Sequence, residues 1–143
     1  MDNIFYEDFE IGDQLGPAEV IIERRNIVKF VQNASLNYKR FTDDDFAKKE
    51  GLGGAIVPGT YSLSLLAKMV TDSFGPAVIM KLGVNFRGLI HHRDVITCGG
   101  MVANKKIEGD EHLLECDVYL ENQDGEKPIK GQAIVRLPSK DNG

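Results

Sequence analysis

The segment TYSLSLLAKMVTDSF, from Thr60 to Phe74, is the strongest indication of the fold. Its apolar side chains recur at helical spacing and cover most of the circumference of a helix. A helix that is apolar on most sides is buried in the protein and does not lie on its surface. At about 1.5 Å per residue such a helix spans roughly 20 Å, so an extensive partner surface has to cover it.

The second half of the chain supplies that surface because it is rich in strand-forming segments. Ala77 to Arg87, Asp94 to Lys105 and Ile129 to Leu137 are predicted strands. From His112 to Leu120 apolar residues alternate with acids, which is typical of a half-buried antiparallel strand. The sequence therefore predicts an α+β domain in which a curved antiparallel β-sheet wraps around one long central helix.

The segments that precede the long helix are mixed in character. Ala18 to Ile22 predicts a short strand, and Glu23 to Ala34 predicts a helix with one apolar face. Thr42, followed three residues later by an acid, is typical of a capping box that begins a short helix. A glycine-rich connection from Gly51 to Gly59 then enters the long helix, and the absence of a following Lys-Ser/Thr pair excludes a P-loop.

Composition limits the classes of function. The chain has 143 residues, which predicts a single domain over 1–143 with a flexible polar tail at 138–143. Lys and Arg number 17 against 22 Asp and Glu, and the net charge of −5 argues against nucleic-acid binding by bulk charge. The absence of a membrane-length apolar run and of a signal peptide predicts a cytoplasmic protein without a membrane partner. Cys98 and Cys116 are expected to be buried, reduced thiols.

Several local motifs follow one another along the chain. They are Glu7 to Asp13, Asp43 to Ala47 with Gly51-Leu52, Ala55 to Gly59, Asn85 to Arg87, and Asp94 to Thr97. In their order and spacing they resemble the MaoC-like dehydratases, the (R)-specific enoyl-CoA hydratase family, which has the hot dog fold. The resemblance implies an acyl thioester of coenzyme A or acyl carrier protein as ligand, with neither a metal nor another cofactor. It also implies a homodimer, or a heteromer with a catalytically complete MaoC-like chain.

The catalytic loop is where the sequence departs from that family. Active members carry Gly-Asp-x-Asn-Pro-x-His-x-Asp, whose Asp and His move the proton beside the thioester carbonyl. With Asp43 in register, Leu36 stands at the Asp position and Phe41 at the His position. Neither side chain can transfer a proton. A one-residue shift places Asn37 or Thr42 there instead, which does not restore the pair.

The binding half of the family's site is expected to remain. The resemblance implies that a backbone N–H at the start of the long helix, at Gly59 and Thr60, faces the thioester carbonyl. Free N–H groups at a helix start stabilise a developing oxyanion. Ser64 either bonds the carbonyl or packs against the sheet, and Leu36 and Phe41 are expected to line an acyl tunnel.

A basic turn before a predicted strand is the candidate for the carrier end of the ligand. His91, His92 and Arg93 form this turn and are candidates for contact with the phosphates of coenzyme A or its pantetheine arm, and Arg87 is a further candidate substrate contact. An exposed turn or a subunit contact explains the same residues. The two histidines have no further metal ligands at typical spacing, so a zinc site is not predicted.

The leading hypothesis is a subunit that lacks the catalytic pair, binds acyl thioesters and belongs to an enoyl-CoA hydratase/dehydratase complex. A second is an active hydratase that uses Asn37, Thr42 or His91 as substitutes. A third is a hot dog thioesterase, although Thr60 to Thr71 lacks the acid that such enzymes place on the central helix. A non-enzymatic acyl-CoA sensor would need an output module for which no residues remain. Helix capping, and not a metal, explains the run Asp43 to Asp45.

Overall fold

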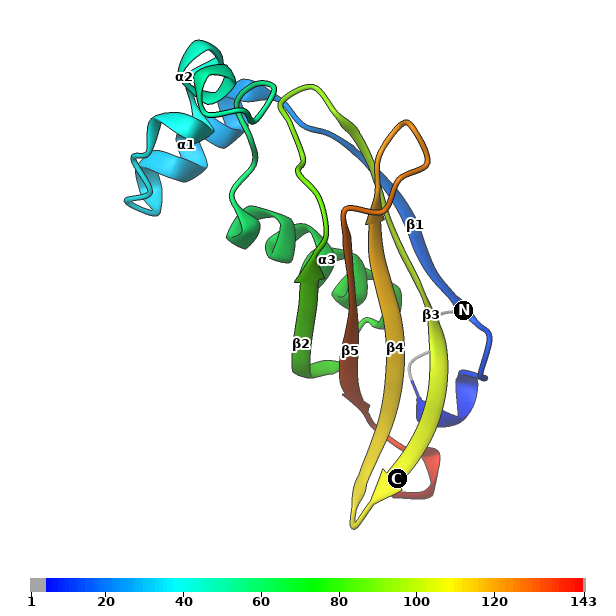
Figure 1. Ribbon diagram of the computed structural model, residues 1–143. Helices are drawn as coiled ribbons and strands as arrows, with labels where there is room; N and C mark the ends of the chain where they lie inside the picture. The colour runs from blue at the N-terminus through cyan, green and yellow to red at the C-terminus, as the bar shows by residue number, and fades with distance from the viewer. Residues whose placement is uncertain (1–4, 143) are drawn as a thin grey trace.

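A five-stranded antiparallel sheet, with strands in the order β1-β3-β4-β5-β2, curves around the helix α3 (Gly59–Phe74), as Figure 1 shows. The computed structural model describes residues 5–142. The predicted α+β architecture is confirmed, and the strands of the second half lie where the sequence places them. The strands are β1 (Gln14–Ile21), β2 (Val78–Phe86), β3 (Val95–Glu108), β4 (Glu111–Glu121) and β5 (Ile129–Leu137).

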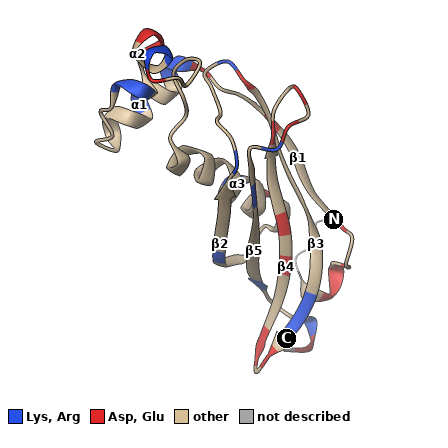
Figure 2. Ribbon diagram, in the orientation of Figure 1, with Lys and Arg blue, Asp and Glu red and all other residues tan. Residues whose placement is uncertain are grey.

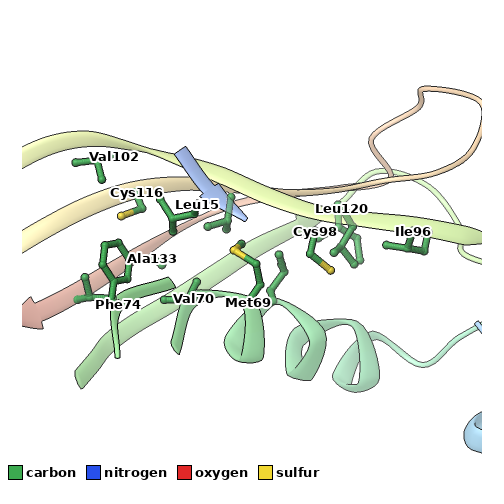
Figure 3. Close-up of a cluster of buried hydrophobic side chains, with 14 of the residues drawn as sticks. Leu15, Met69, Val70, Phe74, Ile96, Cys98, Val102, Cys116, Leu120 and Ala133 are labelled. Atoms are coloured by element: carbon green, nitrogen blue, oxygen red, sulfur yellow. The ribbon is translucent and has the colours of Figure 1, made fainter. Parts of the chain in front are cut away.

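The long helix packs one face onto the concave side of the sheet. Figure 3 shows Met69, Val70 and Phe74 beneath side chains of the strands. The prediction of burial on most sides is therefore correct for this face only. The opposite face is open in the single chain because the sheet covers one side of the helix, and it exposes Ser64, Lys68, Thr71 and Asp72. None of the helices within residues 5–142 is long and apolar enough to cross a membrane.

The inward face of the sheet follows the predicted alternation. In β4 the side chains of Leu114, Cys116, Val118 and Leu120 are all buried. Strands β2 and β5 approach each other closely at Gly131, where a Cβ atom would lie 2.1 Å from the carbonyl oxygen of Gly83. Only glycine fits there without displacing the neighbouring backbone.

Two further helices lie together beyond one end of the sheet, on the side where α3 begins (Figure 1). They are α1 (Arg24–Asn33) and α2 (Asp44–Lys49), joined through the 3-10 turn η2 (Lys39–Phe41). The helix α1 buries Ile27 and Val31, and its Phe30 ring meets the Tyr61 ring of α3 edge to face at 5.1 Å between centroids. This aromatic contact holds α1 against the first turn of α3.

The start of α2 differs by one residue from the sequence prediction. Asp43 caps the helix, because its carboxylate accepts the N–H of Phe46 at 3.0 Å. Thr42 instead ends the preceding η2 turn, so its backbone cannot serve as the helix cap.

The two ends of the described chain are bound to each other. The turn η1 (Tyr6–Asp8) lies beside η3 (Lys140–Asn142). Ser139 is buried and donates to the Glu7 carboxylate at 2.8 Å, while the Lys140 ammonium pairs with Asp8 at 2.7 Å. Of the tail that the sequence predicts at 138–143, residues 138–140 therefore bond to the N-terminal turn, and Gly143 lies outside the described residues.

Candidate functional site

The first turn of α3 presents backbone N–H groups without a side-chain cap. Pro58 occupies the N-cap position and offers no side chain that could accept them. Within residues 5–142, the N–H groups of Gly59 and Thr60 have no hydrogen-bond acceptor, whereas those of Tyr61 and Ser62 donate to the Pro58 carbonyl. The positive end of a 16-residue helix thus carries free donors, which is the arrangement that stabilises a carbonyl oxygen as it gains negative charge.

A phenyl ring lies directly against this helix start. A Cβ atom at Gly59 would lie 2.8 Å from Cζ of Phe86, the last residue of β2. The Phe86 side chain is nevertheless 55% exposed. One edge of the ring therefore contacts the helix start while the other edge remains open.

The loop between α1 and α2 turns two apolar side chains inward. Leu36 and Phe41 are both half-buried and pack against the hydrophobic core. The Tyr38 ring meets the Phe41 ring edge to face at 6.2 Å, and Tyr38 itself is 57% exposed. Two apolar side chains at these positions can contact an acyl chain, but neither can move a proton.

Hydrogen bonds hold this loop close to the segment that leads into α3. The N–H of Ile56 donates to the Arg40 carbonyl at 3.0 Å, and the N–H of Ala55 donates to the Asp44 carboxylate at 2.9 Å. The second bond lowers the pKa of Asp44 below its ordinary value, because it stabilises the ionised carboxylate. The guanidinium of Arg24 donates to the Thr42 carbonyl.

The two histidines of the basic turn support this same segment. The Nε2 atom of His91 lies 2.7 Å from the carbonyl oxygen of Leu52, and its ring packs beside Gly53 and Gly54. Both ring nitrogens of His92 are buried and have no hydrogen-bond partner among the described residues. Burial lowers the pKa of His92 below its ordinary value because the charged imidazolium loses hydration.

The remaining candidates do not converge on the start of α3. Arg87 is exposed, and its backbone N–H donates to the Pro128 carbonyl at 2.7 Å. Ser64 is exposed, and its hydroxyl donates to the Tyr61 carbonyl at 2.6 Å. Asn37 lines a separate, charged cavity of about 800 Å³ between α1 and α2. Of the predicted contact residues, the structure thus places Gly59 and Thr60 at the start of α3 and the others away from it.

The two cysteines are buried free thiols, as the sequence predicts. Burial raises the pKa of Cys98 to about 11 and that of Cys116 to about 12. Both thiols are therefore protonated at neutral pH, and neither is available as a thiolate nucleophile.

No protein-family model and no curated protein matches this chain. Solved structures do match it. The R-hydratase PhaJ1 from Pseudomonas aeruginosa is 17% identical over 96% of this chain and 88% of its own, with a TM-score of 0.86. The MaoC-like dehydratase from Rhodospirillum rubrum is 18% identical over 96% of this chain and 99% of its own, with a TM-score of 0.85.

The chain has the hot dog fold. A chain of the ChsH1-ChsH2 complex from Mycobacterium tuberculosis shares it, at 21% identity over 90% of this chain and 98% of its own, with a TM-score of 0.79. The predicted fold is therefore confirmed. At these identities the comparison establishes how the chain folds, and the chemistry has to be argued from its own residues.

Sequence reasoning missed Phe86 as a neighbour of the site. From the sequence, the motif Asn85-Phe86-Arg87 predicts only the end of a strand. The alternation of Leu82, Val84 and Phe86 contains the missing information, because a period of two places all three on the sheet face that meets α3. What the alternation does not give is the residue of α3 that the ring contacts.

Proposed function

We propose that this chain is a MaoC-like hot dog subunit that binds acyl thioesters and lacks its own proton-transfer pair. Its role is to bind the acyl chain and polarise the thioester carbonyl within an enoyl-CoA hydratase or dehydratase complex. The thioester is carried by coenzyme A or by an acyl carrier protein, and no other cofactor takes part.

The observation that carries the proposal is the combination of free donors at the start of α3 with two apolar side chains in the loop between α1 and α2. The N–H groups of Gly59 and Thr60 supply the electrostatic half of a thioester site. Leu36 and Phe41, at the positions where the family has its catalytic pair, are half-buried among apolar side chains. Such a site binds and polarises a thioester, but it has no group for the proton transfer that hydration requires.

An active hydratase with substitute residues is a weaker candidate. The His91 ring is bonded to the Leu52 carbonyl and packed beside glycines, which leaves it little freedom to handle a substrate proton. Asn37 faces a cavity that Gly59 does not line. A thioesterase is also less favoured, because α3 carries its acid, Asp72, only in the last turn, where it pairs with Lys68 at 2.7 Å.

The free edges of the sheet support assembly through β2. The edge strand β1 is protected, because Pro17 has no N–H to donate and the register is irregular between Leu15 and Ala18. The edge strand β2 exposes Val78 and Met80 at 46% each. We infer that a second copy, or a catalytically complete MaoC-like chain, pairs with β2.

Ligand binding without turnover is the direct test. Dodecanoyl-CoA at a hundredfold excess over its Kd should raise the melting temperature by about 5 °C or more, while free coenzyme A should raise it less. The Leu36→Ser variant should lose this shift, and the matched Tyr38→Ser variant, on the exposed side of the same loop, should keep it. The purified chain should hydrate crotonyl-CoA at the background rate. Robust turnover, or no thermal shift with any acyl-CoA or acyl carrier protein thioester, would contradict the proposal.

A further inference from the structure

A groove runs along the outer face of α1, on the side opposite to its contact with α3. It has a volume of about 940 Å³. Its floor is aliphatic: Ile21, at the end of β1, is 58% exposed, and Val28 is half-buried. Among the described residues no aromatic side chain lines it. The groove is therefore an apolar trough without a platform on which a planar base could stack.

The rim of this groove is cationic, although the protein is acidic overall. Four basic residues line it against one acid, Glu23, whereas the whole chain has a net charge of −5. Figure 2 shows Lys and Arg along α1. The four basic residues are Arg24, Arg25, Lys29 and Arg93.

Two of these cations are available for a partner. Arg24 already donates to the Thr42 carbonyl, and Arg25 pairs with Glu23 at 3.1 Å. The side chains of Lys29 and Arg93 are exposed and form no ion pair within 4.0 Å with any residue between 5 and 142. Arg93 also borders the neighbouring cavity lined by Asp43 to Asp45, and its charge helps to lower the pKa of Asp44. They flank the aliphatic floor, so a partner that covers it meets both charges.

Arg93 stands where the backbone favours glycine. Its φ is 73°, in the left-handed region that side chains other than glycine rarely adopt. Its N–H donates to the Ile22 carbonyl at 2.7 Å, which fixes the turn beside the groove floor. The chain thus places a cationic side chain at the groove where glycine would suit the backbone better.

We propose that this groove docks an acidic acyl carrier protein, with Lys29 and Arg93 pairing with its carboxylates and the aliphatic floor covering an apolar side chain. The inference rests on the proposed function, and it assigns the thioester carrier as a protein. The floor lacks the aromatic surface that free coenzyme A would use for its adenine, whereas an acidic helix complements an aliphatic floor with a cationic rim. Through the contact of Phe30 with Tyr61, the same helix α1 packs against the first turn of α3.

The test uses the full chain and a purified bacterial acyl carrier protein in its apo form, which has no pantetheine arm. Binding of this form depends on the groove and not on the thioester site. The test variant is Lys29→Glu/Arg93→Gly, in which the glycine suits the φ of 73°. The control is Lys127→Glu/Lys130→Gln, which makes the same change of charge at two exposed positions, one in the turn between β4 and β5 and one on β5, away from the β2 edge.

Isothermal titration at low and high salt should show that the apo carrier binds the native chain and that salt weakens this binding. The test variant should bind at least about tenfold more weakly and lose most of the salt dependence, while the control should bind like the native chain. Absence of binding at low salt, equal weakening by the control, or displacement of the carrier by free coenzyme A would overturn the inference. If the apo carrier binds but neither acyl-CoA nor the acylated carrier protein stabilises the chain beyond the apo carrier, the proposed function is refuted and the groove assignment stands.

Discussion

The ring of Phe86 lies on Gly59, so that a Cβ atom at Gly59 would sit 2.8 Å from Cζ of the ring. This contact joins the last residue of β2 to the first residue of α3. The two elements follow each other in the chain, and the contact brings their far ends together. It explains why the start of α3 is a glycine although its φ is not in the left-handed region. It also places an apolar surface at the edge of the free N–H groups.

The first prediction concerns this contact. Gly59→Ala should destabilise the protein by about 1 kcal/mol, near the lower end for overpacking, because the exposed ring can swing aside. In a Phe86→Ala background the same change should cost nothing, or stabilise slightly, because alanine is the better helix former. A double-mutant cycle from chemical denaturation measures the coupling. Additive free energies would show that the ring does not restrict residue 59.

The second prediction tests the register of the catalytic loop. Leu36→Asp/Phe41→His should raise the hydration rate of crotonyl-CoA or longer enoyl-CoA at least roughly 100-fold above the native chain. The reason is that, in the proposed site, the free donors of α3 would polarise the carbonyl, so only proton transfer would be lacking. The single variants should do little, because the two residues act as a unit. The control Leu36→Asn/Phe41→Gln supplies polarity without a proton-transfer group. A folded double variant that stays inactive on all chain lengths would contradict the assignment.

The third prediction concerns pH. Burial lowers the pKa of His92 below its ordinary 6.5, so the folded protein holds this ring neutral while the unfolded chain protonates it near 6.5. Its contribution to stability is complete above pH 6.5 and is lost as the pH falls through the folded-state pKa. His92→Leu should therefore flatten the fall in melting temperature between neutral and mildly acidic pH. An NMR titration that places the pKa of His92 at or above 6.5 would reject this explanation.

The fourth prediction separates two glycines on paired strands. Gly131→Ala should cost about 3 kcal/mol, because the new methyl group would lie 2.1 Å from the Gly83 carbonyl oxygen and would force β2 and β5 apart. Gly83→Ala faces open space and should be neutral, or stabilise by up to roughly 1 kcal/mol. Thermal and chemical denaturation compare the two. Equal effects would mean that the strands tolerate a side chain at both positions.

The fifth prediction addresses assembly. The native chain should be a dimer by light scattering at micromolar concentration, and Val78→Lys/Met80→Lys should shift it to monomers because charge on an edge strand opposes pairing. Ile107→Lys is a suitable control, since Ile107 is 58% exposed on β3 and lies away from this edge. A monomeric native chain would refute pairing of two copies and leave a heteromeric partner to be found by co-expression.

The sequence alone determined the elements whose information is local. The apolar run from Thr60 to Phe74 predicted α3 to within one residue, and the alternation in β4 predicted which side chains are buried, because helical and strand periodicities are properties of short segments. The residue types alone also show that Leu36 and Phe41 cannot transfer protons. Their placement at the positions of a catalytic pair rests on the family resemblance and stays a prediction.

Which distant residues contact each other could be seen only in the tertiary structure. The Phe86 ring reaches Gly59 through the register of β2 on β5 and the position of α3 on the sheet, and neither is encoded within one segment. The His92 ring is buried, and its nitrogens have no hydrogen-bond partner within residues 5–142, because the turn that carries it packs against the segment before α3. The cationic groove likewise joins the end of β1, the outer face of α1 and Arg93. Such juxtapositions arise from the packing of whole elements, which no local periodicity specifies.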